Sequence, residues 1–162
     1  MKLQRGFSIL ELVVVMTIIA ILSKGGSMWL QYQRQQSYAQ LLVQHLAIYE
    51  SALSMYYSEH NGTLSANFTT NTQLKNIADL APYFPYNFTT AILPIDCSFT
   101  LSIDSSNIKI ILNGIPKNLS KLVDSFKKLV AKNCYSGRIS SALSGNSYQI
   151  TYILKDSSTS YL

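Results

Sequence analysis

The chain has 162 residues, of which 48% are hydrophobic and only 13% are charged. That charged fraction is about half the value of an ordinary soluble domain, and Ser, Thr, Asn and Gln take the polar positions instead. The net charge is +5, and without Lys2 and Arg5, which precede an apolar run, it falls to +3. Composition therefore gives no reason to assign a nucleic-acid-binding function, and the length leaves room for one domain of roughly 100 residues beyond that run.

The apolar run begins directly after the short basic leader. Residues 7–22 read FSILELVVVMTIIAIL, which is shorter than the ~20 residues that span a bilayer. Continuing the segment to Leu30 gives enough length and places Trp29 at the outer interface, where aromatic rings are favoured. Lys2 and Arg5 stay in the cytoplasm by the positive-inside rule, so the predicted topology is N-terminus in and C-terminus out.

One residue does not fit a plain membrane anchor. Glu11 lies five residues into the apolar run. A carboxylate inside a bilayer costs a few kcal/mol, and such residues usually have a specific partner. Glu11 is therefore a candidate functional residue.

The leader and the start of the run resemble a known signal. Lys-Leu-Gln-Arg-Gly6 followed by Phe7-Ser-Ile-Leu-Glu11 resembles the class III signal of type IV pilins and type II secretion pseudopilins. The resemblance implies cleavage between Gly6 and Phe7 by a prepilin peptidase, and methylation of the new amine of Phe7. It also implies that Glu11 meets the N-terminal amine of a neighbouring subunit during filament assembly, because each buried charge is costly without the other.

The same resemblance defines the expected role of the chain. It implies a minor pilin or pseudopilin, a structural subunit rather than an enzyme, with no cofactor and no metal. Its partners would be the peptidase, other pilin subunits, the inner-membrane assembly platform and inner-membrane lipid. The subunit would lie in the inner membrane first, and in a periplasmic or surface filament after assembly. The rival interpretation, an ordinary secretory signal peptide, requires a small-x-small cleavage site, which Ser23–Ser27 matches poorly.

A helical period continues beyond the membrane segment. Apolar and aromatic residues recur every three or four positions, which predicts an amphipathic helix: Tyr38, Leu41, Leu42, His45, Tyr49, Leu53 and Tyr56. Asn61-Gly62 is expected to end it, since both residues tolerate a left-handed conformation. Gly25-Gly26 stands where pilins usually have a proline, and we expect any bend there.

The remaining residues predict a small α+β head. A short helix is expected near 74–80, and the aromatic residues at 83, 84, 86 and 88 are expected to cover a sheet. Strands are predicted at 97–103 and 108–112 as a hairpin, with Asn113-Gly114 ending the second. Pro116 then opens a helix that runs to about Lys132. Two more strands are predicted at 135–139 and 148–154.

The predicted fold class is therefore α+β and pilin-like. A long N-terminal helix packs on a small, mostly antiparallel sheet with a second helix inserted between strand pairs. The expected segments are a leader at 1–6, a membrane and polymerisation segment at 7–30, an amphipathic continuation at 31–60 and an exported head at 61–162.

The two cysteines, Cys97 and Cys134, lie far beyond the membrane segment. In an oxidising compartment an even pair indicates one disulfide, which would stabilise the head by roughly 3–4 kcal/mol. The alternative is two buried thiols. No Cys or His stands at ligand spacing from either cysteine, so no metal site is predicted.

Lysines gather at positions 117, 121, 127, 128 and 132. A solvated helix face is the usual meaning of such a run. The alternative function is a tip adhesin or DNA-uptake receptor that uses this helix or the aromatic cluster. An enzyme anchored by the helix has no catalytic constellation to support it.

Overall fold

The computed structural model describes residues 9–86, 88, 96–104, 107–132 and 138–155. The chain divides into two compact units, Met1–Gln35 and Gln36–Leu162. Helix α1 (Ile9–Glu59) begins in the first unit and ends in the second, which we call the head.

Within the first unit, α1 runs through Gly25 and Gly26 without interruption. Each glycine costs a helix interior about 1 kcal/mol relative to alanine, and the sequence predicted that any bend would fall here. A Cβ added at either position would meet nothing within 4 Å. No packing contact therefore requires glycine at these two sites, and the cost is not large enough to end the helix.

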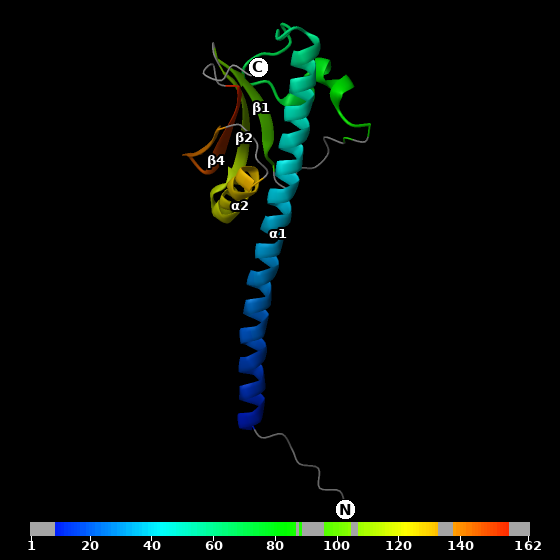
Figure 1. Ribbon diagram of the computed structural model, residues 1–162. Helices are drawn as coiled ribbons and strands as arrows, with labels where there is room; N and C mark the ends of the chain where they lie inside the picture. Colours follow the sequence, from blue (N-terminus) through cyan, green and yellow to red (C-terminus); the bar gives the residue numbers. More distant parts are fainter. Residues whose placement is uncertain (1–8, 87, 89–95, 105–106, 133–137, 156–162) are drawn as a thin grey trace, which may run out of the picture. The chain divides into compact units, whose positions relative to one another are not determined.

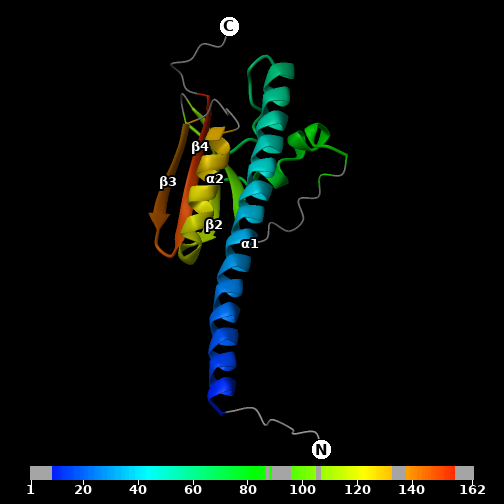
Figure 2. The ribbon, with the colours of Figure 1, turned by 60° about the horizontal axis from the view of Figure 1, so that its bottom comes forward.

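The head contains a four-stranded sheet in the order β1-β2-β4-β3, with every neighbouring pair antiparallel (Figures 1 and 2). Its strands are β1 (Ser98–Ile103), β2 (Ile108–Pro116), β3 (Arg138–Ser144) and β4 (Ser147–Lys155), and α2 (Ser120–Lys132) connects β2 to β3. Three short 3-10 helices complete the described elements: η1 (Leu74–Asn76), η2 (Ala78–Tyr83) and η3 (Lys117–Leu119). The predicted pilin-like α+β architecture, with a helix inserted between strand pairs, is confirmed.

The second strand is longer than the sequence predicted. Asn113-Gly114 was expected to end it, but β2 continues to Pro116. The pairing with β4 shifts register between Leu112 and Ile115, so the Asn-Gly pair lies in a β-bulge rather than in a turn. Beyond the bulge Ile115 is fully buried, and this burial accounts for the extra length. The third strand, β3, continues beyond the predicted end at residue 139 to Ser144, while residues 135–137 of the prediction lie outside the described residues.

The outer edge of β1 is paired by a segment that the sequence did not reveal. The N–H of Asn71 donates to the carbonyl of Leu101 at 2.7 Å, and the N–H of Leu101 donates to the carbonyl of Thr72 at 2.9 Å. Gln73 forms a further bridge with Thr100. These bonds satisfy backbone groups that an edge strand would otherwise present to another chain.

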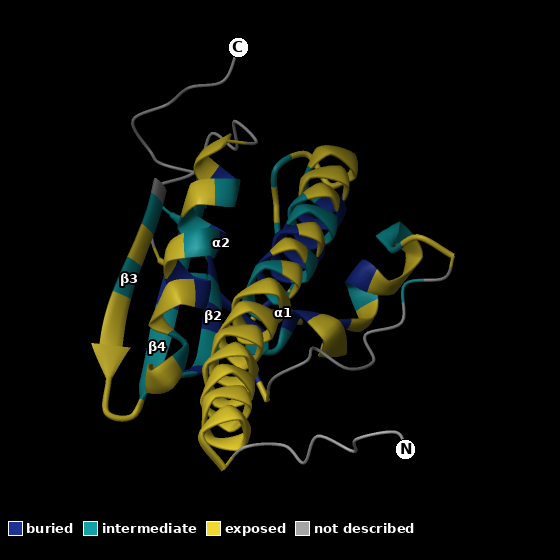
Figure 3. Cartoon of the chain, turned by 90° about the horizontal axis from the view of Figure 1, so that it is seen from below, coloured by how far each residue is buried: buried dark blue, intermediate teal, exposed yellow. Residues whose placement is uncertain are grey.

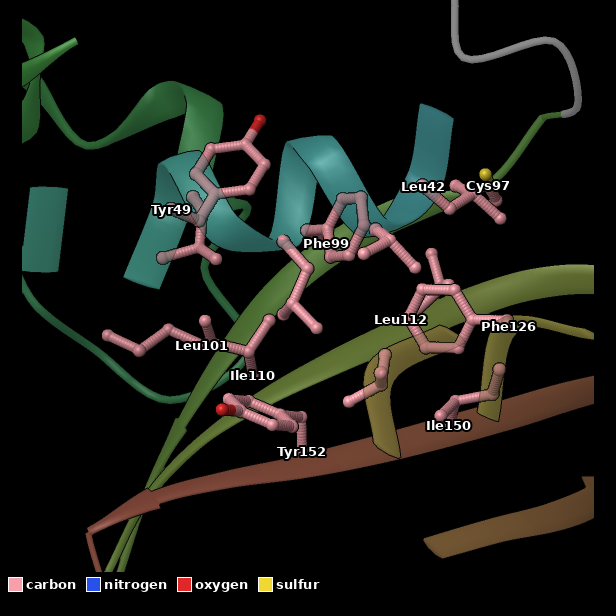
Figure 4. Packing of buried hydrophobic residues seen from close by; sticks show 14 of the residues in the cluster. Leu42, Tyr49, Cys97, Phe99, Leu101, Ile110, Leu112, Phe126, Ile150 and Tyr152 are labelled. Carbon is pink, nitrogen blue, oxygen red and sulfur yellow. The ribbon is translucent and has the colours of Figure 1, made fainter. Parts of the chain in front are cut away.

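The head part of α1 and α2 lie on the same face of the sheet (Figure 2). Alternate residues of the strands point toward them and form one core with both helices (Figure 4). Its fully buried large side chains come from α1, η1, η2, α2 and strands β1, β2 and β4: Leu42, Leu46, Leu74, Leu80, Leu101, Ile110, Leu112, Ile115, Leu122, Phe126, Ile150 and Tyr152. Each contributes about 1.5–3 kcal/mol of transfer free energy.

The aromatic residues at positions 83, 84 and 88 pack mainly on α1, not on the sheet as predicted. The Tyr49 ring lies 5.7 Å from Phe84 and 5.6 Å from Phe88, both edge-on, and the Tyr56 ring lies 5.8 Å from Tyr83. Edge-to-face pairs of this kind add about 0.5–1.5 kcal/mol beyond area burial. α1 is therefore covered by the sheet on one side and by this segment on another, which explains why more of the helix is buried than the predicted stripe.

The helix ends as the sequence predicted. Asn61 and Gly62 both have positive φ, at 54° and 77°. The N–H of Gly62 donates to the carbonyl of Tyr57, five residues earlier, at 2.8 Å. A Schellman C-cap has two hydrogen bonds, and this one corresponds to the bond that spans more residues.

A carboxylate is enclosed between α1 and the sheet. Glu50 accepts a hydrogen bond from the hydroxyl of Tyr152 on β4 at 3.1 Å through Oε1, while its Oε2 is buried without a partner. Burial raises the pKa of Glu50, and the Tyr152 hydrogen bond only partly opposes that shift. The folded head therefore binds a proton at Glu50 more tightly than the unfolded chain does.

This linkage makes stability depend on pH in a defined direction. Because the folded pKa lies above its ordinary value of 4.5, the ionised form opposes folding, and stability falls as pH rises from 4.5 through the folded pKa. Glu50→Gln keeps an oxygen for Tyr152 and removes the charge. We expect the Tm of Glu50→Gln minus that of the wild type to increase between pH 4 and pH 8, measured by circular dichroism on the full chain in detergent.

Two controls isolate the effect. Burial also lowers the pKa of His45, but this contribution is the same in both proteins and cancels in the difference. Asp124→Asn removes a carboxylate from the exposed side of α2 and serves as the reference for the loss of one negative charge. A Glu50→Gln difference that changes with pH no more than this reference does would contradict the raised pKa of Glu50.

Gly114 provides a second test of the fold. Its φ is +91°, and a Cβ would lie 2.6 Å from the backbone oxygen of Asp96. Gly114→Ala adds left-handed strain of about 1–2 kcal/mol to a clash with backbone that must move, so we expect the free energy of unfolding to fall by about 2–4 kcal/mol. Gly145→Ala is the matched control, because φ is +61° there but nothing lies within 4 Å of the added Cβ. Equal losses in urea titrations of the two variants would contradict the close approach.

Candidate processing and assembly site

The predicted cleavage and methylation residues, Gly6 and Phe7, lie outside the described residues. The described part of the site begins at Ile9, where α1 starts, and Glu11 lies in the first turn of the helix. An acidic side chain there is favoured by the positive end of the helix dipole. Glu11 also follows Ser8 with the Ser-x-x-Glu spacing of a capping box, so its role at the helix start must be separated from any role toward a partner.

The helix around Glu11 exposes its apolar side chains on all sides (Figure 3). Leu10 is 74% exposed, Val13 57% and Leu22 67%. A soluble surface does not carry a continuous apolar area of this extent. In length and composition α1 suits a membrane span, so lipid or other apolar helices must cover this segment.

The hydroxyl side chains of the segment are satisfied by the helix itself. Thr17 donates to the carbonyl of Val13 at 2.7 Å, and Ser23 donates to the carbonyl of Ile19 at 2.7 Å. Glu11 cannot use this solution, because an ionised carboxylate only accepts hydrogen bonds and the helix carbonyls are acceptors too. Within the described part of the chain, no donor is placed against Glu11. Its charge must therefore be met by the helix start or by another molecule.

Only one of the two cysteines lies within the described residues. Cys97 is 9% exposed, and burial raises the pKa of its thiol to about 11. Cys134 lies outside the described residues, so the predicted disulfide stays a prediction. Among the described residues, no three His, Cys, Asp or Glu side chains lie together as a metal site would require.

Strand register bears on that disulfide. Ser98, next to Cys97, pairs with Asn113, whereas Arg138 pairs with Ile153 and through it with Lys109. These levels are four residues of β2 apart, about 13 Å, and the outer strands lie three spacings or about 14 Å apart. The Cα atoms of Ser98 and Arg138 are thus roughly 19 Å apart. Four residues of extended chain from Arg138 reach about 14 Å, the one residue from Ser98 adds about 4 Å, and a disulfide joins Cα atoms up to about 7 Å apart, so the two cysteines are within reach of each other.

This geometry therefore allows the predicted Cys97–Cys134 disulfide. We expect the full chain, denatured without reductant and treated with iodoacetamide, to gain no alkyl group by intact mass until it is reduced. Cys134→Ser should gain one alkyl group without reduction. A wild-type monomer that gains two alkyl groups without reduction would refute the disulfide and leave two thiols.

Comparison with known protein families gives a match, and it covers the start of the chain. Residues 1–23 match the family model described as the prokaryotic N-terminal methylation motif. The chain carries a class III prepilin signal. This signal marks substrates of the type IV pilin and pseudopilin pathway, and its 23 residues include the predicted positions Gly6, Phe7 and Glu11. Comparison with curated proteins and with solved structures gives no match.

Sequence reasoning missed other features of the head. The Glu50–Tyr152 contact joins residues 102 positions apart, and no local pattern marks it. Tyr83 donates to Glu59 at 2.5 Å, which connects η2 to the end of α1. These two hydrogen bonds depend on which faces of α1 are covered by β4 and by η2. Only the tertiary structure shows which elements cover each face.

Proposed function

We propose that the protein is a pilin-like structural subunit, a minor pilin or pseudopilin, that is cut between Gly6 and Phe7, methylated on Phe7 and assembled into a filament. The observation that carries the proposal is Glu11, an acceptor-only charge in an apolar helix that exposes every side and bears a prepilin signal. In an ordinary membrane anchor the charge of Glu11 would have no partner. In a filament, the N-terminal amine of a neighbouring subunit could pair with it.

The chemistry of assembly follows from removing the leader. Cleavage at the Gly6–Phe7 peptide bond creates a cationic amine and removes the charges of Lys2 and Arg5. In low dielectric an amine and a carboxylate attract strongly, and each is costly when it is left alone. A subunit that enters the filament with its amine at the Glu11 of its neighbour satisfies both charges, so this pair favours one register of insertion.

The proposal includes location and partners. Residues 7–30 would cross the inner membrane with the N-terminus in the cytoplasm, and residues 31–60 and 61–162 would lie outside it. The prepilin peptidase, the assembly platform and other pilin subunits would act on the segment while it is in lipid. Support comes from the signal and from the exposed apolar helix.

Two substitutions separate pairing from helix capping. Glu11→Gln keeps a side chain that can serve at the last position of a capping box, but it removes the charge. Glu11→Ala removes both. We expect both variants to lose Met1–Gly6 and gain one methyl group by intact mass, and both to enter filaments at least tenfold less than wild type, as measured by immunoblotting of sheared filament fractions.

A matched carboxylate elsewhere on α1 serves as the control. Glu59→Gln should assemble normally, because Glu59 is exposed in the head and bonds Tyr83. If Glu11→Gln assembles normally and only Glu11→Ala enters filaments less, Glu11 acts as a helix cap and not as a charge that pairs with a neighbour. A wild-type product cut after Ser23–Ser27 would refute the filament proposal altogether.

The alternative function is a tip adhesin or DNA-uptake receptor, which would use either the aromatic residues at 83–88 or the lysines of α2. The structure supports the lysine surface better than the aromatic one. Tyr86 is fully exposed, but Phe84 and Phe88 pack on Tyr49, so the aromatic residues do not form a shared platform. The lysines of α2 do share one face.

A further inference from the structure

The apolar part of α1 carries a second charged residue, Lys24. Between Ile9 and Gln33 the charged residues are Glu11 and Lys24, and the helix exposes both of them. Within the described part of the chain, neither one takes part in a salt bridge. Glu11 is also the single acidic residue of Met1–Gln35. It is therefore the one carboxylate that this unit can offer to Lys24.

Lys24 cannot pair with Glu11 of its own chain. The two residues are 13 positions apart in one continuous helix, which is about 20 Å along the axis. At 100° per residue they also lie about 140° apart around the helix. A partner for either charge must therefore come from another molecule.

Lipid accounts for Lys24 only while the subunit is in the membrane. Lys24 follows Leu22, the end of the apolar run, by two residues, so its long side chain can extend to the headgroups. In the proposed filament the headgroups are gone, and the apolar helices of other copies surround this segment. An ammonium group among apolar side chains is costly unless a carboxylate meets it.

Parallel helices can bring the two charges together at one offset. Copies that leave one membrane in the same orientation have parallel α1 segments. If a neighbour is displaced by 13 residues, about 20 Å, its Lys24 is level with Glu11 of the first copy. The contact is not reciprocal, because the other Glu11 and Lys24 are then 26 residues apart. Each copy thus uses Glu11 toward one neighbour and Lys24 toward another, as in the head-to-tail contacts that build open filaments.

One carboxylate can serve both Lys24 and the N-terminal amine. An ionised carboxylate has two oxygens and about four acceptor sites. The amine of Phe7 lies four residues before Glu11, whereas Lys24 lies 13 residues after it. The two cations that reach one Glu11 therefore come from two different copies, which are displaced in opposite directions along the axis.

We propose that Lys24 of a neighbouring copy, displaced by 13 residues along the helix axis, is a second cation for Glu11 in the filament. The inference rests on the proposed function and adds a partner residue to the same site. Buried ion pairs are weak as a source of stability, and their best-attested use is to fix register. The Lys24 pair would fix a longer offset than the amine does, and other offsets would leave Lys24 among apolar side chains.

Cysteine cross-linking tests the offset without changing either charge. Val15 and Met28 lie one turn after Glu11 and Lys24, are also 13 residues apart, and are 44% and 65% exposed. In filaments that contain both Val15→Cys and Met28→Cys subunits, we expect oxidation with copper phenanthroline to give a disulfide-linked dimer on non-reducing immunoblots. Each variant alone should give no dimer, which also controls for the native cysteines. Ile21→Cys is the matched control for Met28→Cys, because it lies within about 20° of the same side but about 10 Å nearer the N-terminus.

The charge itself is tested by assembly. Lys24→Gln should lose Met1–Gly6 and gain one methyl group by intact mass, but enter sheared filament fractions at least threefold less than wild type. Lys24→Arg keeps the charge and should enter filaments normally. Arg34→Gln removes another exposed cation of α1, outside the apolar segment, and should also assemble normally.

The outcomes separate this inference from the proposed function. Wild type that forms no filament would refute both. If Glu11→Gln fails to assemble but Lys24→Gln assembles like wild type, the Lys24 contact is wrong and the proposed function stands. Cross-linking of Val15→Cys that is as strong with Ile21→Cys as with Met28→Cys would also refute the offset. An equal loss in Arg34→Gln would show that net charge, and not this pair, controls assembly.

Discussion

One helix has to satisfy two different surroundings, and the rest of the structure depends on that constraint. In the first unit α1 exposes large apolar residues on every side, as only lipid or other apolar helices allow. From Ala39 onward the same helix is the centre of the head and buries a wide face. Ala39 and Ala52 are fully buried there, and their small side chains let the neighbouring elements approach the helix closely.

Local features of the chain were predictable from the sequence. The prepilin signal is a contiguous motif whose chemistry depends on residue order, so no folding is needed to recognise it. Strand and helix periods located β1, the start of β2 and the end of α2, because each buries one regular face. The predicted helix start at Pro116 was wrong, because β2 continues to Pro116 and α2 begins at Ser120, after η3. Asn61-Gly62 marked the end of α1 correctly, since the requirement for positive φ is met by two adjacent residues.

Features that depend on distant partners were not predictable. Asn113-Gly114 has turn chemistry, but the burial of Ile115 and the pairing with β4 make it a bulge within β2. The aromatic residues after η2 have no period that indicates whether they cover the sheet or α1. The pairing of Thr72 with Leu101 extends the sheet through a segment with no strand pattern. In each case tertiary contacts outweighed local propensity.

The two glutamates with unmet acceptors show how position along α1 changes the meaning of the same side chain. Glu50 has Tyr152 as a donor for one oxygen and lies within a folded core, so its remaining cost can be relieved by taking up a proton. Glu11 stands in an apolar helix with no folded surroundings of its own. A carboxylate that is retained in such a segment is therefore better explained by an intermolecular partner than by stability of the chain itself.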